Sequence, residues 1–478
     1  MLKLLSLIAL LASVVALPAN SLANSTEIEW ISCAENTPQP LQGLIPNATL
    51  ASLPLTLSCG HLPVPIDWSQ PISENNSMAV AFAKYSPPNA VGNLFFCPGG
   101  PGQESASNAW EVALGTTNLL EGLESFNITM MDIRGSYQSN AINCSAAVYG
   151  AIPQDFPTSQ DEFDALKEAS AAWTATCTPA DLIPFLSTEH VAQDFEALRV
   201  ALKAGKSHYL GVSYGSFYGA EWASRFPEAL ERLVFDGIFG HGLNNSQLVG
   251  YGVRAANREL VRADANCQYN TSCPFHSQGK GSIIVVCYFA LHYQAFQTLN
   301  MLQQAYNQLL TNLTAMPMQA SACLNTTSCF TPVTARNFED GVYSYLFNNP
   351  DYDLLFTGLA AALEGDASYF ARQELAIEGF DSVTGLLCAD VEWATDSFYN
   401  TPNSYLVVRH GDVHTSFGFI DVPASAARDI GISYLANGTL PPAQNSSEVA
   451  VYTPGTKRAP IADPYSAPQG IAAGDYPT

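Results

Sequence analysis

The sequence is poor in positive charge. It holds 19 lysine and arginine residues against 43 aspartate and glutamate residues, a net charge of −24 at neutral pH. Nucleic-acid binding relies on cations that neutralise phosphates, so this balance argues against a nucleic-acid partner. An acidic pocket would instead favour a cation such as the amino terminus of a peptide.

The sequence also lacks an apolar run long enough to cross a bilayer, which takes about 20 residues. Its leading apolar run, residues 4–16, follows Lys3 and precedes small residues up to Ala23. This order is typical of a secretory signal peptide, which we expect over residues 1–23. The next apolar run, residues 283–291, is shorter. We therefore expect a secreted protein without a membrane anchor.

The eleven cysteines lack the paired C-x2-C spacing of a structural zinc site. Disulfides are the default use of cysteine in an exported protein. Cys267 with Cys273, and Cys323 with Cys329, are close enough in sequence to close small loops, and the odd count leaves at least one thiol unpaired. Eleven Asn-x-Ser/Thr sequons predict a glycoprotein.

Short apolar segments alternate with helical segments over residues 24–241. The segment 191–204 places Val191, Phe195, Leu198 and Leu202 on one helical face. Several of the strand candidates are short and wholly apolar, as expected for strands buried on both faces. This alternation predicts an α/β protein with a mostly parallel sheet flanked by helices. The strand candidates are residues 80–83, 94–96, 129–131, 209–212 and 233–235.

The rest of the chain divides into three parts. Residues 242–380 hold two C-x5-C pairs and helical segments at 305–313 and 354–364, which predicts an inserted, mainly helical cap. Residues 381–441 return to the core, with a strand at 405–408 and a helix at 424–437 that ends at Asn437-Gly438. Residues 442–478 are rich in Pro, Ser, Gly and Ala, so a loosely ordered tail is expected.

The strongest chemical signal is the motif Gly211-Val212-Ser213-Tyr214-Gly215. It follows a strand candidate and opens a helical run, which is the context of a nucleophile elbow. The elbow lifts the serine hydroxyl out of a tight turn, where side chains in place of the glycines would collide with backbone. We predict the α/β-hydrolase fold with Ser213 as nucleophile, the alternative being an accidental match in a loop.

A second motif, Pro98-Gly99-Gly100-Pro101-Gly102, follows the strand candidate at 94–96. Glycines at such a site let backbone N–H groups face a developing oxyanion. Pro101 has no N–H, so Gly100 is the predicted donor. Tyr214, the residue after the nucleophile, is predicted to supply the second.

The general base should be a histidine near the C-terminal end, because this fold presents its triad in the order serine, acid, histidine. His410 and His414 lie in the right region, on a loop directly after the strand candidate at 405–408, and we predict His414. Their H-x-x-x-H spacing lacks the glutamate of a metalloprotease motif, so neither a metal nor a cofactor is expected.

Together these motifs resemble secreted peptidases of the prolyl aminopeptidase and tripeptidyl aminopeptidase group, a branch of the α/β-hydrolases. The resemblance implies that Gly100 belongs to the oxyanion hole, that Ser213 is the nucleophile and that His414 is the base. It also implies a structural role for Asp132 and Arg134, with Arg134 supporting the site. It rests on CGHLPVPID at 59–67, PGGPG at 98–102, DIRG at 132–135, residues 186–240, and GDVHTSF ending at Phe417.

The resemblance fails at the triad acid. Relatives carry this acid on an Asp-x-x-Thr-Pro-like segment after the next-to-last strand, and that segment is missing here. Asp396, 18 positions before His414, is the predicted acid, with Asp390 as the alternative. Residues 283–299 also match nothing expected in relatives. An error in the predicted coding sequence would explain both departures, and sequencing the transcript would test it.

The resulting prediction is a secreted aminopeptidase or tripeptidyl aminopeptidase that cleaves short peptides with a free amino terminus through an acyl-enzyme on Ser213. An esterase or lipase is the first alternative, because the same elbow serves esters. A catalytically impaired pseudo-hydrolase is the second, because loss of the orienting acid costs about four orders of magnitude in turnover.

Overall fold

The structure is a computed structural model that describes part of the chain. The described residues are 27–149, 152, 157–238, 259–278, 283, 305–321, 331–346, 350–371, 405–409, 416–417, 425–446 and 449–453. Within these ranges, no helix has both the length and the apolar character needed to span a bilayer. The expected signal peptide lies outside the described residues.

The described residues build a seven-stranded sheet in the order β1-β2-β3-β5-β4-β6-β7. Strands β5, β4, β6 and β7 run parallel, while β1, β2 and β3 form an antiparallel edge. All five predicted strands lie in this sheet, which is mixed rather than wholly parallel. Its strands are β1 (Glu29–Ile31), β2 (Leu57–Val64), β3 (Met78–Tyr85), β4 (Asn93–Cys97), β5 (Asn127–Met131), β6 (Ser207–Val212) and β7 (Leu230–Asp236).

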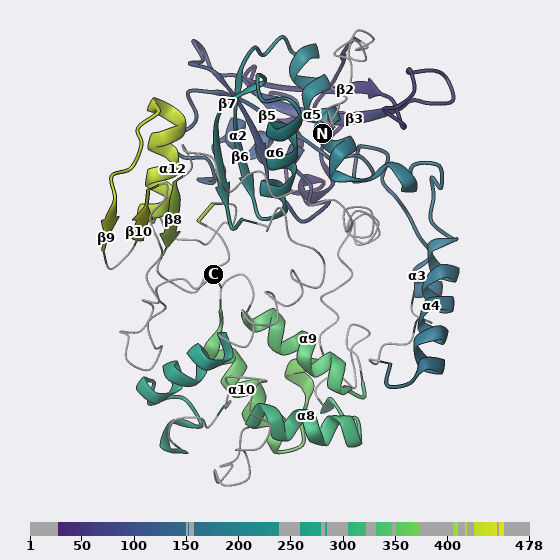
Figure 1. The fold of residues 1–478 in the computed structure, drawn as a ribbon, viewed down its shortest axis with the longest axis vertical. Coiled ribbons are helices and arrows are strands. Elements are labelled where there is room, and N and C mark those ends of the chain that lie inside the picture. The colour runs from purple at the N-terminus through teal and green to yellow at the C-terminus, as the bar shows by residue number, and fades with distance from the viewer. Residues whose placement is uncertain are drawn as a thin grey trace, which may run out of the picture.

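Helices cover both faces of the sheet (Figure 1). Neighbouring strand residues point to opposite faces, so Phe95 packs with α5 (Thr188–Ala201) and α6 (Tyr214–Arg225). Phe96 instead packs with α2 (Ala106–Leu114) and α12 (Ala426–Asn437). The helical face predicted within residues 191–204 is confirmed, since Val191, Phe195 and Leu198 are buried in the first cluster. The strand β6, between β4 and β7, is buried along its whole length.

Shorter elements connect these layers. The helix α4 begins with a capping box, in which the Ser159 hydroxyl and the Glu162 carboxylate each bind the other residue's backbone N–H. The remaining elements of this part are η2 (Gln39–Leu41), α1 (Asn47–Leu50), α3 (Ala146–Tyr149), α4 (Gln160–Thr174) and η3 (Ile183–Phe185).

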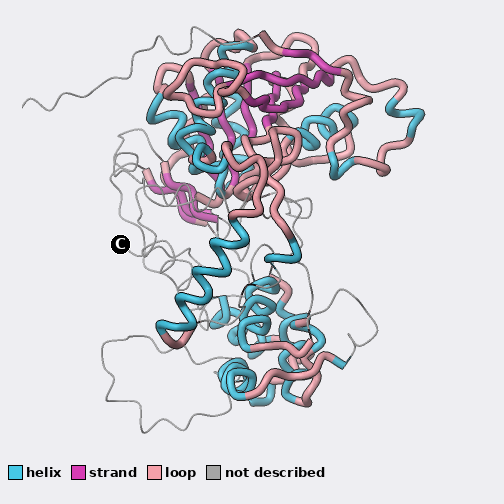
Figure 2. Tube along the Cα trace, turned by 90° about the vertical axis from the view of Figure 1, so that its right-hand side faces the viewer, coloured by secondary structure: helices cyan, strands magenta, loops and turns pink. Residues whose placement is uncertain are grey.

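A group of helices lies at the end of the molecule opposite the sheet (Figures 1 and 2). Helices α8 and α10 confirm the predicted segments 305–313 and 354–364. They enclose an apolar cluster of their own, which includes Leu309, Phe338 and Phe356. The elements are η4 (His276–Gln278), α8 (Ala305–Ala315), α9 (Ala335–Leu346), α10 (Tyr352–Leu363) and η6 (Ser368–Phe370). The bounds 242–380 of the cap stay a prediction.

The C-terminal strands differ from expectation. The predicted strand at 405–408 is present as β8 (Leu406–Arg409), but it pairs with β10 (Val449–Tyr452) in a separate sheet completed by β9 (Gln444–Asn445). The loose tail expected over 442–478 is therefore wrong for β10, whose residues Val449, Ala450 and Val451 are buried. Alternating β-branched residues favour a strand there, although the surrounding composition suggests a tail. The predicted helix at 424–437 is confirmed, and Gly438 ends it at φ +70°.

Three disulfides join described cysteines. The short loop Cys267–Cys273 is confirmed, while Cys323 and Cys329 lie outside the described residues. Cys97 is a buried free thiol, consistent with the odd count. The two other bonds, Cys33–Cys59 and Cys144–Cys177, close loops with sequence separations of 26 and 33.

Candidate active site

Ser213 sits on a sharp turn between β6 and α6. Its backbone has φ +54° and ψ −124°, a conformation that non-glycine residues adopt mainly at strained functional turns. The N–H of Ser213 donates to the carbonyl of Asp236 at 2.8 Å, and the N–H of Ser216 donates to the carbonyl of Ser213 at 2.9 Å. Val212 and Tyr214 are buried, whereas Ser213 is partly exposed. This is the geometry of a nucleophile elbow.

The two glycines of the motif are required by close backbone approaches. A Cβ atom on Gly211 would collide with the carbonyl of Gly215. A Cβ atom on Gly215 would collide with the carbonyl of Cys97, at the end of β4. The spacing of the motif therefore follows from the packing of α6 against β6 and β4.

The glycine turn at 98–102 lies against this elbow. Gly99 has φ +103°, and a Cβ added to it would meet the Val212 carbonyl at 2.5 Å and the Tyr214 nitrogen at 2.9 Å. Gly100 has φ +106°, and its added Cβ would meet the backbone nitrogens of Gly102 and Gln103 within the turn itself. The turn thus brings the predicted oxyanion donors Gly100 and Tyr214 to the same end of the sheet as Ser213.

Asp132 holds the segment that follows the glycine turn. Its Oδ1 accepts hydrogen bonds from the N–H groups of Ser105 at 2.9 Å and Ala106 at 3.2 Å, at the start of α2. The hydroxyl of Ser139 donates to the backbone carbonyl of Asp132 at 2.7 Å. The end of β5 is thereby tied to the chain just beyond the oxyanion turn, which supports the structural role expected for Asp132.

The predicted base and acid cannot be placed beside this serine. His414, Asp396 and their alternatives His410 and Asp390 all lie outside the described residues. Two residues just after His414 are described, and the N–H groups of Ser416 and Phe417 both donate to Asp236 Oδ2, at 2.6 and 2.5 Å. Asp236 was not singled out from the sequence, where it lies within the segment 186–240 that carries the resemblance.

A family model described as the alpha/beta hydrolase fold matches residues 92–324. The chain has the α/β-hydrolase fold. It is 26% identical over 226 residues to a tripeptidyl aminopeptidase of Streptomyces coelicolor, a match that covers 44% of this chain and 38% of the relative.

Two further relatives have similar identities. The serine protease Hip1 of Mycobacterium tuberculosis is 27% identical over 259 residues, covering 52% of this chain and 46% of the relative. A putative hydrolase of Escherichia coli, YuaR, is 28% identical over 271 residues, covering 54% and 51%. The matches thus span from 38% to 51% of the length of these relatives.

We expect Gly99→Ala to lower the rate of acylation by about 100-fold or more, the size of effect seen when one oxyanion donor is lost. The methyl group would press on the Val212 carbonyl and the Tyr214 nitrogen, and so displace the turn from the elbow. Gly115→Ala is the matched control, because Gly115 also has positive φ, +66°, but its added Cβ meets nothing within 4 Å. Equal acylation rates in the two variants, measured by stopped-flow kinetics, would contradict this role of Gly99.

A pair of buried carboxyl groups lies behind the glycine turn. Glu104 and Asp132 are 5% and 0% exposed. Burial, together with the nearby Asp132 carboxylate, raises the pKa of Glu104 well above its usual value. Burial also raises the pKa of Asp132. The Glu104 carboxyl accepts a hydrogen bond from the Ser107 N–H at 2.9 Å and contacts the Ser107 hydroxyl closely.

This pair predicts a pH effect on stability. A raised pKa in the fold means that the folded state retains a proton that the unfolded chain releases, so the stabilisation is complete below the ordinary glutamate pKa and falls as pH rises through the folded pKa. Glutamine is always uncharged at this position. Between about pH 5 and 8, Glu104→Gln should therefore lose on the order of 1 kcal/mol less unfolding free energy than wild type does. Urea titrations across this range would test it. Glu168→Gln, on the exposed face of α4, is the control, and parallel curves for Glu104→Gln and wild type would refute the effect.

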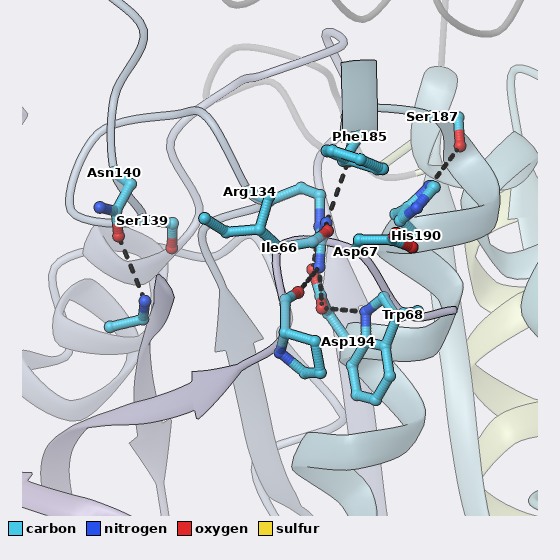
Figure 3. A network of polar contacts seen from close by, with 12 residues as sticks. Ile66, Asp67, Trp68, Arg134, Ser139, Asn140, Phe185, Ser187, His190 and Asp194 are labelled. Atoms are coloured by element: carbon cyan, nitrogen blue, oxygen red, sulfur yellow. Dashed lines mark hydrogen bonds and ion pairs between the residues drawn. The ribbon is translucent and has the colours of Figure 1, made fainter. Parts of the chain in front are cut away.

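Arg134 is fully buried and joins several segments (Figure 3). Its guanidinium forms a bidentate ion pair with Asp194 of α5, with Nε–Oδ2 and Nη2–Oδ1 distances of 2.7 Å. The indole N–H of Trp68 donates to the same carboxylate at 3.0 Å. The other guanidinium N–H groups donate to three backbone carbonyls, those of Pro65, Ile66 and Phe185. These contacts support the expected structural role of Arg134, because they join the end of β5 to α5, which packs against the sheet.

A second serine and histidine lie next to this network (Figure 3). The Ser187 hydroxyl is 2.8 Å from Nδ1 of His190, one helical turn further along α5. Burial and the nearby Arg134 lower the pKa of His190 to about 4. In a catalytic triad the serine contacts Nε2 while Nδ1 faces the acid. Ser187 contacts Nδ1 instead, so this pair is not oriented as a nucleophile and base. It stabilises the start of α5.

Proposed function

We propose that the protein is a serine peptidase that cleaves short peptides from their free amino terminus, with Ser213 as nucleophile. The observation that carries the proposal is the contact between two backbone features, the elbow at Ser213 and the glycine turn at Gly99 and Gly100. Together they offer a nucleophile and two N–H donors at one end of the sheet. That constellation is the one acyl transfer requires.

The proposed reaction begins when the Ser213 hydroxyl attacks the peptide carbonyl carbon and His414 accepts the hydroxyl proton. The carbonyl oxygen becomes an oxyanion that the N–H groups of Gly100 and Tyr214 stabilise. Collapse of this intermediate breaks the C–N bond, and His414 returns the proton to the leaving amine. Water then attacks the acyl-enzyme by the same route and regenerates Ser213.

Peptides are favoured over esters by the similarity to proteins named tripeptidyl aminopeptidase and serine protease. The net charge of −24 also favours a substrate with a cationic amino terminus. An esterase remains the second candidate, because the elbow and the glycine turn serve esters equally well.

The same proposal includes secretion. The three disulfides between described cysteines are expected in an oxidising compartment. The apolar run at residues 4–16 is the expected secretory signal. Amino-terminal sequencing of protein recovered from the culture medium would test this, with a mature chain that begins near residue 24 as the expected result.

A matched substrate panel tests the proposed activity. It contains a tripeptide amide reporter with a free amino terminus, the same reporter acetylated, a single-residue proline reporter, and a short acyl ester. We expect turnover of the free tripeptide or proline reporter and at least about 100-fold less turnover of the acetylated one. Turnover of the ester alone would support the esterase instead. Folded protein that turns over none of them would support the pseudo-hydrolase.

A further inference from the structure

Asp236 contacts both segments that the proposed reaction uses. It is the last residue of β7 and lies opposite Val212 in the parallel pairing of β7 with β6. Its backbone carbonyl accepts the hydrogen bond from the Ser213 N–H at 2.8 Å. The main chain of Asp236 therefore fixes one side of the nucleophile elbow.

The side chain of Asp236 points to a different part of the chain. Its Oδ2 atom accepts hydrogen bonds from two consecutive N–H groups, those of Ser416 at 2.6 Å and Phe417 at 2.5 Å. These residues are 180 and 181 positions away in sequence. Bonds from backbone N–H groups to an ionised carboxylate are stronger than those between neutral groups.

Apolar packing holds the same segment on its other side. Phe417 is buried at 3% exposure. Its ring lies close to α12, since a Cβ atom added to Gly431 would meet it at 3.2 Å, and the Arg428 guanidinium lies 5.9 Å from the ring centre. Residues 416 and 417 are thus fixed between the Asp236 carboxylate and a helix.

We propose that Asp236 is a positioning residue, which sets the distance between the nucleophile and the chain segment that carries the base. The inference rests on the proposed function and on His414 as base. His414 is two positions before Ser416, and consecutive Cα atoms are about 3.8 Å apart, so a fixed Ser416 limits the reach of the base. One residue then sets the elbow through its carbonyl and the base segment through its carboxylate.

A role as triad acid is the competing interpretation, because the segment that holds the acid in relatives is missing. The contacts support positioning, because the two N–H groups that Oδ2 accepts belong to the segment just after His414. The two roles differ in what an amide can replace. The oxygen of an asparagine still accepts backbone N–H bonds, whereas an asparagine in place of a triad acid stabilises the wrong histidine tautomer and costs about 10⁴-fold in turnover.

The test compares Asp236→Asn with Asp236→Ala in the full-length secreted protein. We expect Asp236→Ala to lower kcat about 100-fold with little change in KM, because misplacing a reacting group by about 1 Å costs about that much. Asp236→Asn should retain kcat within about 10-fold of wild type, with an unchanged pH profile of kcat/KM. A loss near 10⁴-fold in Asp236→Asn would overturn positioning in favour of the acid role, and full activity in both variants would also overturn it.

Hydrogen exchange at the backbone gives a readout that does not need activity. The peptide containing Ser416 and Phe417 should exchange faster in Asp236→Ala and close to the wild-type rate in Asp236→Asn. Glu162→Ala is the matched control, because one Glu162 oxygen also accepts two consecutive N–H groups, those of Thr158 and Ser159, at the exposed start of α4. Unchanged exchange at 416–417 in Asp236→Ala would show that the Asp236 carboxylate does not fix this segment, and would refute its positioning role. Inactive wild type with the expected exchange pattern would refute only the proposed function.

Discussion

Ser213→Ala is expected to abolish covalent labelling by a fluorophosphonate probe and to lower turnover of the tripeptide reporter by about 10⁶-fold, the loss measured when the nucleophilic serine of a serine protease is removed. The methyl group keeps the size of the side chain but removes the attacking oxygen. Residual turnover should remain above the uncatalysed rate, because the backbone donors of the oxyanion turn are unaffected. Steady-state kinetics and gel fluorescence of the labelled protein measure the two effects.

The fold should tolerate this change. Ser213 is partly exposed, and the hydrogen bonds that define the elbow use its backbone N–H and carbonyl. We therefore expect the urea midpoint of Ser213→Ala to match that of wild type. Ser187→Ala is the control, because the Ser187 hydroxyl lies 2.8 Å from Nδ1 of His190 within the described part of the chain. Labelling that persists in Ser213→Ala and disappears in Ser187→Ala would identify Ser187 as the nucleophile and refute the assignment of Ser213.

The elbow and the glycine turn were predictable because their signals are local. In the Gly-x-Ser-x-Gly motif, a side chain at Gly211 would collide with the backbone of Gly215, and one at Gly215 would collide with the end of β4. The same two positions need glycine wherever a strand turns sharply into a helix at a nucleophile elbow. The strands β4 and β6 were predictable because burial on both faces leaves a short, wholly apolar run. The strand β2, which pairs with β1 and β3, was missed because it contains Gly60 and Pro63, which are uncommon in strands.

Contacts between distant parts of the chain were beyond the sequence. Asp236 meets Ser416 and Phe417 only because β7 and α12 lie side by side, and no spacing rule encodes a separation of 180 residues. The bonds Cys33–Cys59 and Cys144–Cys177 were not predicted for a similar reason, since cysteine count does not determine connectivity. The strand β10 was hidden because a four-residue apolar run is a weak signal within a tail rich in proline and serine.

Arg134→Met is expected to cost about 3–5 kcal/mol of unfolding free energy, the range measured when one partner of a buried ion pair is removed. The variant leaves the Asp194 carboxylate buried at 0% exposure without its arginine. The Trp68 indole N–H still donates to this carboxylate. The variant also removes the donors to the carbonyls of Pro65, Ile66 and Phe185. Against a typical domain stability of about 5–15 kcal/mol, this loss leaves the fold marginal.

The pH dependence of the unfolding free energy of Arg134→Met separates the cost of a buried, unpaired charge from the cost of lost packing. Burial raises the pKa of Asp194 and Arg134 opposes this rise, so without the arginine the pKa rises further. A group with a raised pKa in the fold retains its stabilisation at low pH and loses it as pH rises. The cost of Arg134→Met in urea unfolding should therefore be smaller at pH 5 than at pH 7.

Two controls isolate the buried pair. Lys206→Met removes an ion pair of 3.2 Å with Glu228, but the two side chains are 56% and 92% exposed, so its cost should stay below about 1 kcal/mol. The double variant Arg134→Met with Asp194→Leu should recover part of the loss, because no charge is then left buried alone. If Arg134→Met costs no more than Lys206→Met, Arg134 does not stabilise the fold through Asp194. A recovery in the double variant that stops short of wild type would assign the remainder to the three carbonyls, since they still lack their donors.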